Sequence, residues 1–425
     1  MKNHRRAFLK LGAAAGTFGL IHPTHAAAEQ TKAQTNDLAA KLAAAMTAPA
    51  LRTDLFKQPV KLASIELLKN GKHYLVRARS TDGAEGLAAG HDSVLETTYP
   101  ILVKRVAPYF VGKDARALEE LIEGVYLRDS NYKWQGLPFW VCVAGVEIAV
   151  LDLLGKVAGK PVGELLDGGF KGAGRREVAV YRASGNRGNT PEAEIAYLQK
   201  IVAETGAQAI KFRLGARMSY DDASTKRDLA MIPLTRKTFG DRMTIYADAN
   251  GSYDVPMAIR MGRLMEEQKF RFFEEPVPFD YYDETKHVAD ALKIPIALGE
   301  QESSLRSFRR IIEHGTARIV QPDLLYFGGL TRSIKVARMA AAAGLECTPH
   351  MSGGGLGYLY IAHFASCVPN CGPHQEYKGE EETLPVECAT SSLKSEKGMM
   401  KIPSGPGLGV TFDPDFVKRA QLVSA

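Results

Sequence analysis

Three carboxylates stand at equal intervals in the middle of the chain, each at the end of a short apolar run. They are Asp248, Glu274 and Glu300, and 26 residues separate each from the next. Short apolar runs closed by a polar or turn residue are typical of buried strands, so each acid is expected at a strand's C-terminal end. Acids on neighbouring parallel strands converge, and three unpaired carboxylates would repel one another. The pattern therefore predicts a cation between them, and all-oxygen ligands favour one Mg²⁺ per site.

The same rhythm of short apolar runs continues on both sides of these acids. Five further strands are predicted, which makes eight: residues 177–182, 209–214, 317–323, 345–350 and 370–377. Helical patterns lie between the runs, for example at 255–268 and 332–343. Eight such steps over about two hundred residues predict a barrel of the (β/α)₈ type, whose catalytic groups lie at the C-terminal strand ends. Lys211, Asp323 and His350 also fall at such ends.

The composition is compatible with a barrel plus a second, smaller domain. The chain has 425 residues, of which 45% are hydrophobic and 24% are charged, as in ordinary soluble globular proteins. The formal net charge of +6 is modest, and no basic stripe is interleaved with aromatic residues. Nucleic-acid binding is therefore not expected.

Residues 1–28 predict a twin-arginine export signal. Arg5 and Arg6 begin its core, an apolar Ala/Gly-rich stretch follows at 11–21, and small residues at 24–28 form a cleavage region. The apolar stretch is too short to span a bilayer, so no stable membrane insertion is expected. We therefore expect a periplasmic protein. Twin-arginine export carries folded proteins, which suits an enzyme that takes up its metal in the cytoplasm.

The five cysteines do not form a recognisable metal site. An odd number in an exported protein leaves at least one of them outside any disulfide. Cys142 and Cys347 lie in apolar runs and are expected in the core, whereas Cys367 and Cys371 are close enough to pair, which the sequence leaves open. The Cys and His spacings do not resemble a zinc site.

The remainder of the chain divides into four parts. The predicted boundaries are an Ala-rich linker at 29–55, an α+β capping domain at 56–176, the barrel at 177–385 and a C-terminal segment at 386–425 that packs back on the cap. In the cap, residues 60–68 and 73–80 alternate like strands around Asn70-Gly71, a strong hairpin signal. Helical patterns follow at 97–103, 115–126 and 139–154.

An ordered set of motifs along the chain resembles the enolase superfamily, in its mandelate racemase/muconate lactonizing branch. The motifs are residues 143–159, Ala247-Asp248-Ala249-Asn250, Glu274-Glu275-Pro276, Gly299-Glu300, Gln321-Pro322-Asp323 and Gly328-Gly329. The resemblance covers nearly the whole mature chain. It implies an α+β capping domain over a modified TIM barrel, and abstraction of the proton α to a carboxylate. It also implies that Asp248, Glu274 and Glu300 bind the metal.

The resemblance implies that His350 and Asp323 form the base dyad. An aspartate behind an imidazole fixes its tautomer and raises its basicity, and a Lys or His base with Mg²⁺ is the known pattern of this superfamily. Lys211 and Arg213 alternate on the second strand and so face the same side. Racemases of this branch have a second lysine where Arg213 stands, and arginine does not readily lose a proton. This departure favours one base, His350, with both cations holding the substrate carboxylate; Lys211 as a base stays an alternative.

Four further residues complete the predicted site. The resemblance places Glu376 on the eighth strand as an acid that hydrogen-bonds the enediolate, and Asn250 beside the metal, its water or the substrate. Arg182, at the end of the first strand, is a candidate for binding a distal hydroxyl or carboxylate. Tyr132, within 128–136, belongs to a candidate lid. Ion pairs or an ordinary surface loop are the structural alternatives for these residues.

The predicted reaction is dehydration of a sugar acid to a 2-keto-3-deoxy acid, in which His350 removes the α-proton and the β-hydroxyl leaves. Racemisation, epimerisation or cycloisomerisation of another carboxylate is the second hypothesis, and a non-catalytic solute-binding protein is the third. A binder has no need of a base dyad, which disfavours the third hypothesis. The expected partner is a small carboxylate, and a homo-oligomer is expected because oligomers are common in this superfamily.

Overall fold

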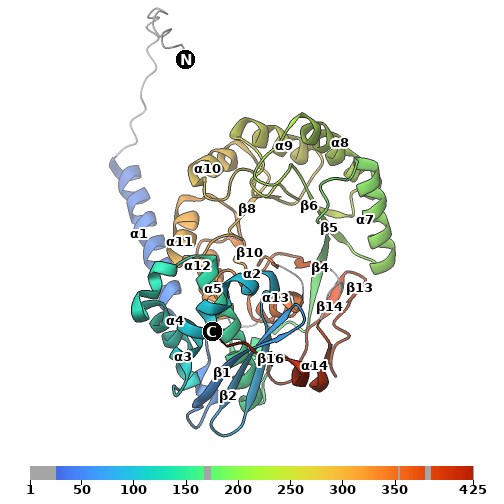
Figure 1. Ribbon diagram of the computed structural model, residues 1–425. Coiled ribbons are helices and arrows are strands. Elements are labelled where there is room, and N and C mark those ends of the chain that lie inside the picture. The colour runs from blue at the N-terminus through green and yellow to red at the C-terminus, as the bar shows by residue number, and fades with distance from the viewer. Residues whose placement is uncertain (1–24, 167–173, 353–354, 379–383, 425) are drawn as a thin grey trace, which may run out of the picture.

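The computed structural model describes residues 25–166, 174–352, 355–378 and 384–424. The twin-arginine core and most of the predicted export signal lie outside the described residues. The described chain forms an α+β cap and a barrel, which lie side by side in Figure 1. The fold class predicted from the sequence is therefore confirmed.

The cap is built on an antiparallel sheet in which β1 (Leu62–Asn70), β2 (His73–Ser80) and β3 (Glu85–Ala89) pair in chain order and the C-terminal strand β16 (Gln421–Leu422) pairs with β1 as the fourth strand. A two-residue turn joins β1 to β2, and Gly71 in this turn has a φ of +59°, a conformation that glycine adopts without strain. The predicted hairpin is therefore present. Helical segments follow, among them α2 (Asp92–Ile101), a π-helical turn at Leu102–Val106, α3 (Ala107–Phe110) and α4 (Leu118–Leu127).

The long helix α5 (Leu137–Ala158) packs against β2 and β3 and forms the core of the cap. By length and composition alone, helix α5 could span a membrane, but 89% of its most apolar 18-residue stretch is buried inside the protein. Its burial on nearly all sides explains its uniformly apolar sequence. Helix α5 is therefore a core helix whose apolar character is accounted for by its packing.

Eight parallel strands form the barrel, and the three acids end or follow three neighbouring strands. The strands are β4 (Glu177–Ala183), β5 (Ala209–Arg213), β6 (Thr244–Asp248), β7 (Phe273–Glu274), β8 (Ile296–Leu298), β9 (Ile319–Val320), β10 (Glu346–Cys347) and β11 (Gln375–Tyr377). Neighbours pair in chain order from β4 to β10, and β11 pairs with β4. Strand β10 does not pair with β11 in the described chain; the Cys347 N–H of β10 instead donates to the carbonyl of Asn370, in the segment before β11, at 3.0 Å.

Seven helices alternate with these strands and surround them in Figure 1. They are α7 (Pro191–Thr205), α8 (Asp222–Phe239), α9 (Val255–Glu267), α10 (Tyr282–Ala291), α11 (Leu305–His314), α12 (Leu330–Ala342) and α13 (Gly357–Cys367). Helix α9 shows the local logic: Asp254 caps its N-terminus by accepting the Met257 N–H, and Ala258, Met261 and Met265 bury one face.

After β11 the described chain departs from the predicted eighth strand-helix step. It continues through β12 (Val386–Glu387), β13 (Ser395–Glu396), β14 (Met399–Lys401) and β15 (Thr411–Phe412), then α14 (Pro414–Arg419) and β16 (Gln421–Leu422). Strand β16 pairs with β1 of the cap, whereas β14 pairs antiparallel with β4 of the barrel. The C-terminal segment therefore contacts both domains.

Helix α1 (His25–Thr47) occupies most of the stretch at 29–55 that the sequence predicted as an Ala-rich linker. Its C-terminal half packs against α12, with Leu42 fully buried, and the Arg338 guanidinium donates to the Ala48 carbonyl at 2.8 Å. Figure 1 shows this helix running along the outside of the barrel beside α11 and α12.

All five cysteines are thiols in the structure. Cys142 and Cys347 are buried in the core, as predicted. The possible pairing of Cys367 with Cys371 does not occur. The Cys367 S–H instead donates back to the Phe364 carbonyl within α13, at 3.3 Å.

Candidate active site

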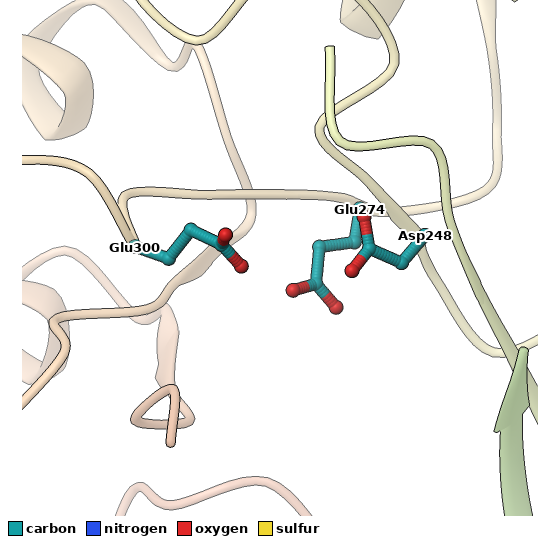
Figure 2. A group of neighbouring side chains, drawn as sticks. All are labelled: Asp248, Glu274 and Glu300. Atoms are coloured by element: carbon teal, nitrogen blue, oxygen red, sulfur yellow. The ribbon is translucent and has the colours of Figure 1, made fainter. Parts of the chain in front are cut away.

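The three acids lie together at one end of the barrel. Asp248 ends β6, Glu274 ends β7 and Glu300 follows β8 by two residues. One oxygen from each lies within 4.8 Å of the others, and Figure 2 shows the carboxylates of Asp248 and Glu274 facing that of Glu300. All three side chains are buried, and Glu274 Oε1 accepts no hydrogen bond from the described residues. A buried all-oxygen set with an unsatisfied acceptor fits a hard divalent cation such as Mg²⁺.

Two cations on β5 face these acids from the same side of the strand, as alternation predicts. Lys211 Nζ lies 2.8 Å from Glu274 Oε2, and Arg213 contacts Asp248. Burial by itself would lower the pKa of Lys211, but the negative charges of Glu274 and Glu376 outweigh burial and raise it. Burial raises the pKa of Glu274, and the positive charge of Lys211 offsets only part of this increase.

His350 and Asp323 form a hydrogen-bonded pair across the mouth of the barrel. His350 Nδ1 lies 2.7 Å from Asp323 Oδ2, and the backbones of the two residues form a parallel bridge. Asp323 Oδ1 accepts the N–H groups of Leu325 and Tyr326 at 2.8 Å and the Ser352 O–H at 3.0 Å. Because a carboxylate at Nδ1 holds the proton there, Nε2 is left as the basic nitrogen.

The free nitrogen of this dyad faces the acids. His350 Nε2 lies 3.3 Å from Glu300 Oε2 and 3.8 Å from Glu376 Oε2. Burial would lower the pKa of His350, but Glu300, Glu376 and Asp323 outweigh it and raise the pKa. Burial would raise the pKa of Glu300, but His350 and Arg213 outweigh it and lower the pKa. The geometry therefore brings the free nitrogen of one imidazole up to the acids of the site.

Glu376 and Asn250 are also brought into the site. Glu376 Oε1 lies 3.4 Å from Lys211 Nζ, and Oε2 accepts the Met351 N–H at 2.9 Å. Burial would raise the pKa of Glu376, but Lys211 and Lys378 outweigh it and hold the pKa well below its usual range. Asn250 donates its backbone N–H to Asp248 Oδ1 at 2.8 Å and its amide to Glu300 Oε1 at 3.3 Å.

Two domain families match the chain on either side of the cap–barrel junction. Residues 45–167 match the N-terminal domain of mandelate racemase / muconate lactonizing enzyme, and residues 194–416 match the enolase C-terminal domain-like family. The chain belongs to the enolase superfamily. Its resemblance to the mandelate racemase/muconate lactonizing enzyme family is thereby confirmed.

Named relatives of this enolase-superfamily protein include sugar-acid dehydratases. It is 28% identical over 328 residues to the arabinonate dehydratase of Saccharolobus solfataricus, covering 77% of this chain and 83% of that one. It is 30% identical over 344 residues to the D-galactonate dehydratase of Ralstonia nicotianae, covering 78% and 87%. Among solved structures, a mandelate racemase/muconate lactonizing protein from Paracoccus denitrificans Pd1222 complexed with magnesium superposes with a TM-score of 0.77 at 26% identity, covering 86% of this chain and 99% of that one.

Two residues that the sequence suggested as substrate-binding lie elsewhere. The Arg182 guanidinium lies 5.3 Å from the centroid of the Tyr377 ring, and Tyr377 packs in the core cluster outside the barrel interior. Alternation along β4 explains this placement, because the interior position belongs to Tyr181. Tyr132 is 43% exposed and packs edge-on against Tyr126 of the cap. Among the described residues, neither side chain forms a hydrogen bond or an ion pair with the metal triad or the dyad.

Sequence reasoning missed two residues of this superfamily site. The Tyr181 hydroxyl is buried without a hydrogen-bond partner among the described residues, and Lys211 Nζ lies 5.0 Å from its ring centroid. Burial, with Glu376 nearby, holds the pKa of Tyr181 well above its usual value. Strict alternation applied to β4 would have found it. Arg187, on the loop after β4, donates to Asn250 Oδ1, and no sequence pattern signals that contact. Burial and the neighbouring Arg213 and Arg217 lower the pKa of Arg187 to about 10.

Proposed function

We propose that the protein is a Mg²⁺-dependent dehydratase, which removes water from a sugar acid and releases a 2-keto-3-deoxy acid. The observation that carries the proposal is the arrangement of three groups around one buried space. The carboxylates of Asp248, Glu274 and Glu300 converge there, Lys211 and Arg213 stand beside them, and the His350–Asp323 dyad faces them. A weakly acidic proton α to a carboxylate requires such a combination of cations and one positioned base.

The metal would be held by Asp248, Glu274 and Glu300. Bound Mg²⁺ supplies Lewis-acid stabilisation to the carboxylate oxygens of the substrate. The all-oxygen donor set supports this assignment, as does the unsatisfied Glu274 Oε1. The magnesium complex of the Paracoccus denitrificans relative is consistent with it.

The remaining steps fall to side chains of this chain. Lys211 and Arg213 hold the substrate carboxylate and the negative charge that develops on it. His350 Nε2 takes the α-proton, while Asp323 accepts from Nδ1–H and stabilises the imidazolium. The imidazolium then gives that proton to the departing β-hydroxyl, which leaves as water in a syn elimination. Glu376 keeps Lys211 oriented and fixes the Met351 backbone next to His350.

Dehydration is favoured over racemisation because the site holds one well-placed imidazole base. Arg213 stands where a second base would be needed, and guanidinium groups do not readily lose a proton. Lys211 is fully buried and lies between Glu274 and Glu376, which favours its charged form. The names of the arabinonate and D-galactonate dehydratases support the same choice.

The test is proton NMR in D₂O with purified protein, Mg²⁺ and matched mono- and diacid sugars. We expect loss of one substrate and appearance of a 2-keto-3-deoxy product, both abolished by EDTA and by His350→Asn. The exposed His314→Asn variant is the matched control and should retain activity. Exchange of the α-proton without water loss would instead establish racemisation or epimerisation. Absence of exchange throughout an exhaustive panel, with metal bound, would contradict the proposal.

We also propose that the protein acts in the periplasm. The support is the twin-arginine core at Arg5 and Arg6 followed by an apolar stretch and small residues. Cell fractionation of the full chain should place the mature protein in the periplasm, and replacing both arginines by lysine should retain it in the cytoplasm. Equal distribution of the two proteins would contradict this assignment.

A further inference from the structure

Two of the five cysteines lie on neighbouring segments of the barrel. Cys347 ends β10, and Cys371 lies in the segment that leads into β11. These two segments are the neighbours that form no strand pairing in the described chain. The contacts between them therefore decide how the barrel closes.

One backbone hydrogen bond sets the register of the two segments. The Cys347 N–H donates to the Asn370 carbonyl at 3.0 Å. In a parallel pair the residue before the N–H donor lies opposite the carbonyl acceptor, as it does between β5 and β6. The bond therefore sets Glu346 opposite Asn370, and the next pair along the two segments is Cys347 opposite Cys371.

The contact one step further agrees with this register. The Gly372 N–H donates to Thr348 Oγ1 at 3.1 Å, and a Cβ on Gly372 would lie 2.4 Å from the same oxygen. Gly372 therefore faces Thr348. Because side chains alternate along extended backbone, Cys347 and Cys371 share the opposite face.

Both thiols lie in one hydrophobic cluster, as this register requires. Cys347 is fully buried in the cluster, and the half-buried Cys371 packs against it. Neighbouring strands lie about 4.8 Å apart, and disulfides join residues whose Cα atoms are about 4.4–6.8 Å apart. Opposed positions on one face therefore meet the distance requirement for a disulfide.

The segment before Cys371 is held firmly against the barrel. Arg175 donates to the Val368 carbonyl at 3.0 Å and to the Pro369 carbonyl at 2.9 Å. The Asn370 side-chain amide donates to the Leu345 carbonyl at 3.1 Å. These bonds keep the two thiols close before any covalent bond forms.

The two thiols differ in reactivity. Burial raises the pKa of Cys371 to about 12, against the opposing effect of the Arg175 guanidinium. Burial, with Cys371 beside it, holds the pKa of Cys347 well above its usual value. Thiolates carry out disulfide exchange, so both groups react slowly, and the half-buried Cys371 is the one that an outside reagent reaches.

We propose that Cys347 and Cys371 form a disulfide within the folded barrel when the protein meets a disulfide oxidant. The Cys371 thiolate attacks the oxidant's disulfide and releases one thiol. The Cys347 thiolate then attacks the Cys371 sulfur of the mixed disulfide and releases the second thiol. The two cysteines lose two electrons and two protons, which the oxidant takes up. Export from the cytoplasm, as proposed above, brings the protein to such oxidants.

The bond would join the strands that lead to two residues of the site. His350 follows Cys347 by three residues, and Glu376 lies on β11 just after Cys371. The disulfide would also close a loop of about 25 residues, which restricts the unfolded chain and stabilises the folded one.

The chemical test oxidises the purified full chain with glutathione disulfide and maps its non-reduced peptides by mass spectrometry. We expect one linked pair, Cys347 with Cys371, and a fall in free thiols from five to three. Cys371→Ser should abolish the link. Cys388→Ser is the matched control, because Cys388 is also half-buried, and it should keep the link. Five free thiols after prolonged oxidation, a glutathione adduct that stays on Cys371, or a link between Cys367 and Cys371 would overturn the proposal.

A second measurement needs no substitution. Thermal unfolding compares the oxidised wild-type protein with the same sample after reduction by dithiothreitol. We expect the oxidised form to have a Tm several degrees higher, and Cys371→Ser to show no such difference. A linked form with an equal or lower Tm would overturn the proposal, because a bond that matches the native register must stabilise the barrel.

Discussion

Lys211 allows a quantitative test of how the site is held together before a metal binds. Its Nζ lies 2.8 Å from Glu274, 3.4 Å from Glu376 and 4.0 Å from Asp248. Neither Lys211 nor these acids expose more than 1% of their surface. Lys211 therefore neutralises carboxylates that water does not reach.

The perturbation is Lys211→Met, which keeps the length of the side chain and removes its charge. Removing one partner of a buried ion pair costs about 3–5 kcal/mol, a large share of the ~5–15 kcal/mol that stabilises a typical protein. The remaining carboxylates relieve part of this cost by taking up a proton. We therefore expect the destabilisation to be smaller at pH 5 than at pH 8.

The assay is urea unfolding in EDTA, followed by fluorescence, for wild-type protein, Lys211→Met and the control Lys200→Met. Lys200 is 73% exposed on α7, so its substitution should change the free energy of unfolding by less than about 1 kcal/mol. A ligand at a hundred times its Kd that binds only the folded state adds about 2.7 kcal/mol. Because the triad is more negative without Lys211, Mg²⁺ should stabilise the variant more than the wild type.

The reasoning is refuted if Lys211→Met unfolds in EDTA like Lys200→Met at both pH values. The ion pairs of Lys211 would then contribute nothing net to stability. A variant destabilised as expected but insensitive to Mg²⁺ would retain the ion-pair argument and exclude a metal at the triad.

Three further results are expected. Asp323→Asn should lower kcat at least about a hundredfold with little change in KM, because the substitution disturbs the tautomer of His350. Steady-state kinetics measures this loss, and an unchanged kcat would show that the His350–Asp323 dyad is not the base. Burial lowers the pKa of His363 to about 4, against the opposing hydrogen bond to the Leu408 carbonyl. Because the pKa of His363 is lower in the folded protein than its unfolded value of 6.5, the neutral imidazole contributes stability above pH 6.5. About 3 kcal/mol of this stability is lost as the pH falls from 6.5 towards 4. Unfolding curves of His363→Gln should lack this pH dependence. Gly329 and Gly240 both have a positive φ with an extended ψ, which costs an alanine about 1–3 kcal/mol of backbone strain. A Cβ at Gly329 would also lie 2.3 Å from Glu147 Oε2, whereas one at Gly240 would meet open space, so Gly329→Ala should lower the free energy of unfolding by more than Gly240→Ala.

Sequence reasoning located the barrel, the acidic triad and the face of β5 that carries Lys211 and Arg213. These features follow from local rules: apolar runs end at strand ends, side chains alternate along a strand, and parallel strand ends meet at one side of a barrel. The pairing of Asp323 with His350, by contrast, was expected from the resemblance to the enolase superfamily, and the two side chains lie 2.7 Å apart.

Other features depended on contacts between distant segments. Whether Tyr181 or Arg182 faces the interior depends on the register of β4 between its neighbours in the barrel, and Arg182 instead lies over Tyr377. Arg187 reaches Asn250 across 63 positions of sequence from an irregular loop, which has no periodicity to read.

The sequence by itself determined which acids and cations meet at the barrel mouth, because residue type and strand spacing place them at neighbouring strand ends. The tertiary structure alone decided what surrounds that chemistry. It assigned the interior of β4 to Tyr181, sent the C-terminal segment to both domains through β14 and β16, and set Cys371 beside Cys347. The physical reason is that periodicity is a local property of the backbone, whereas loop conformation and strand register arise from packing among segments far apart in sequence.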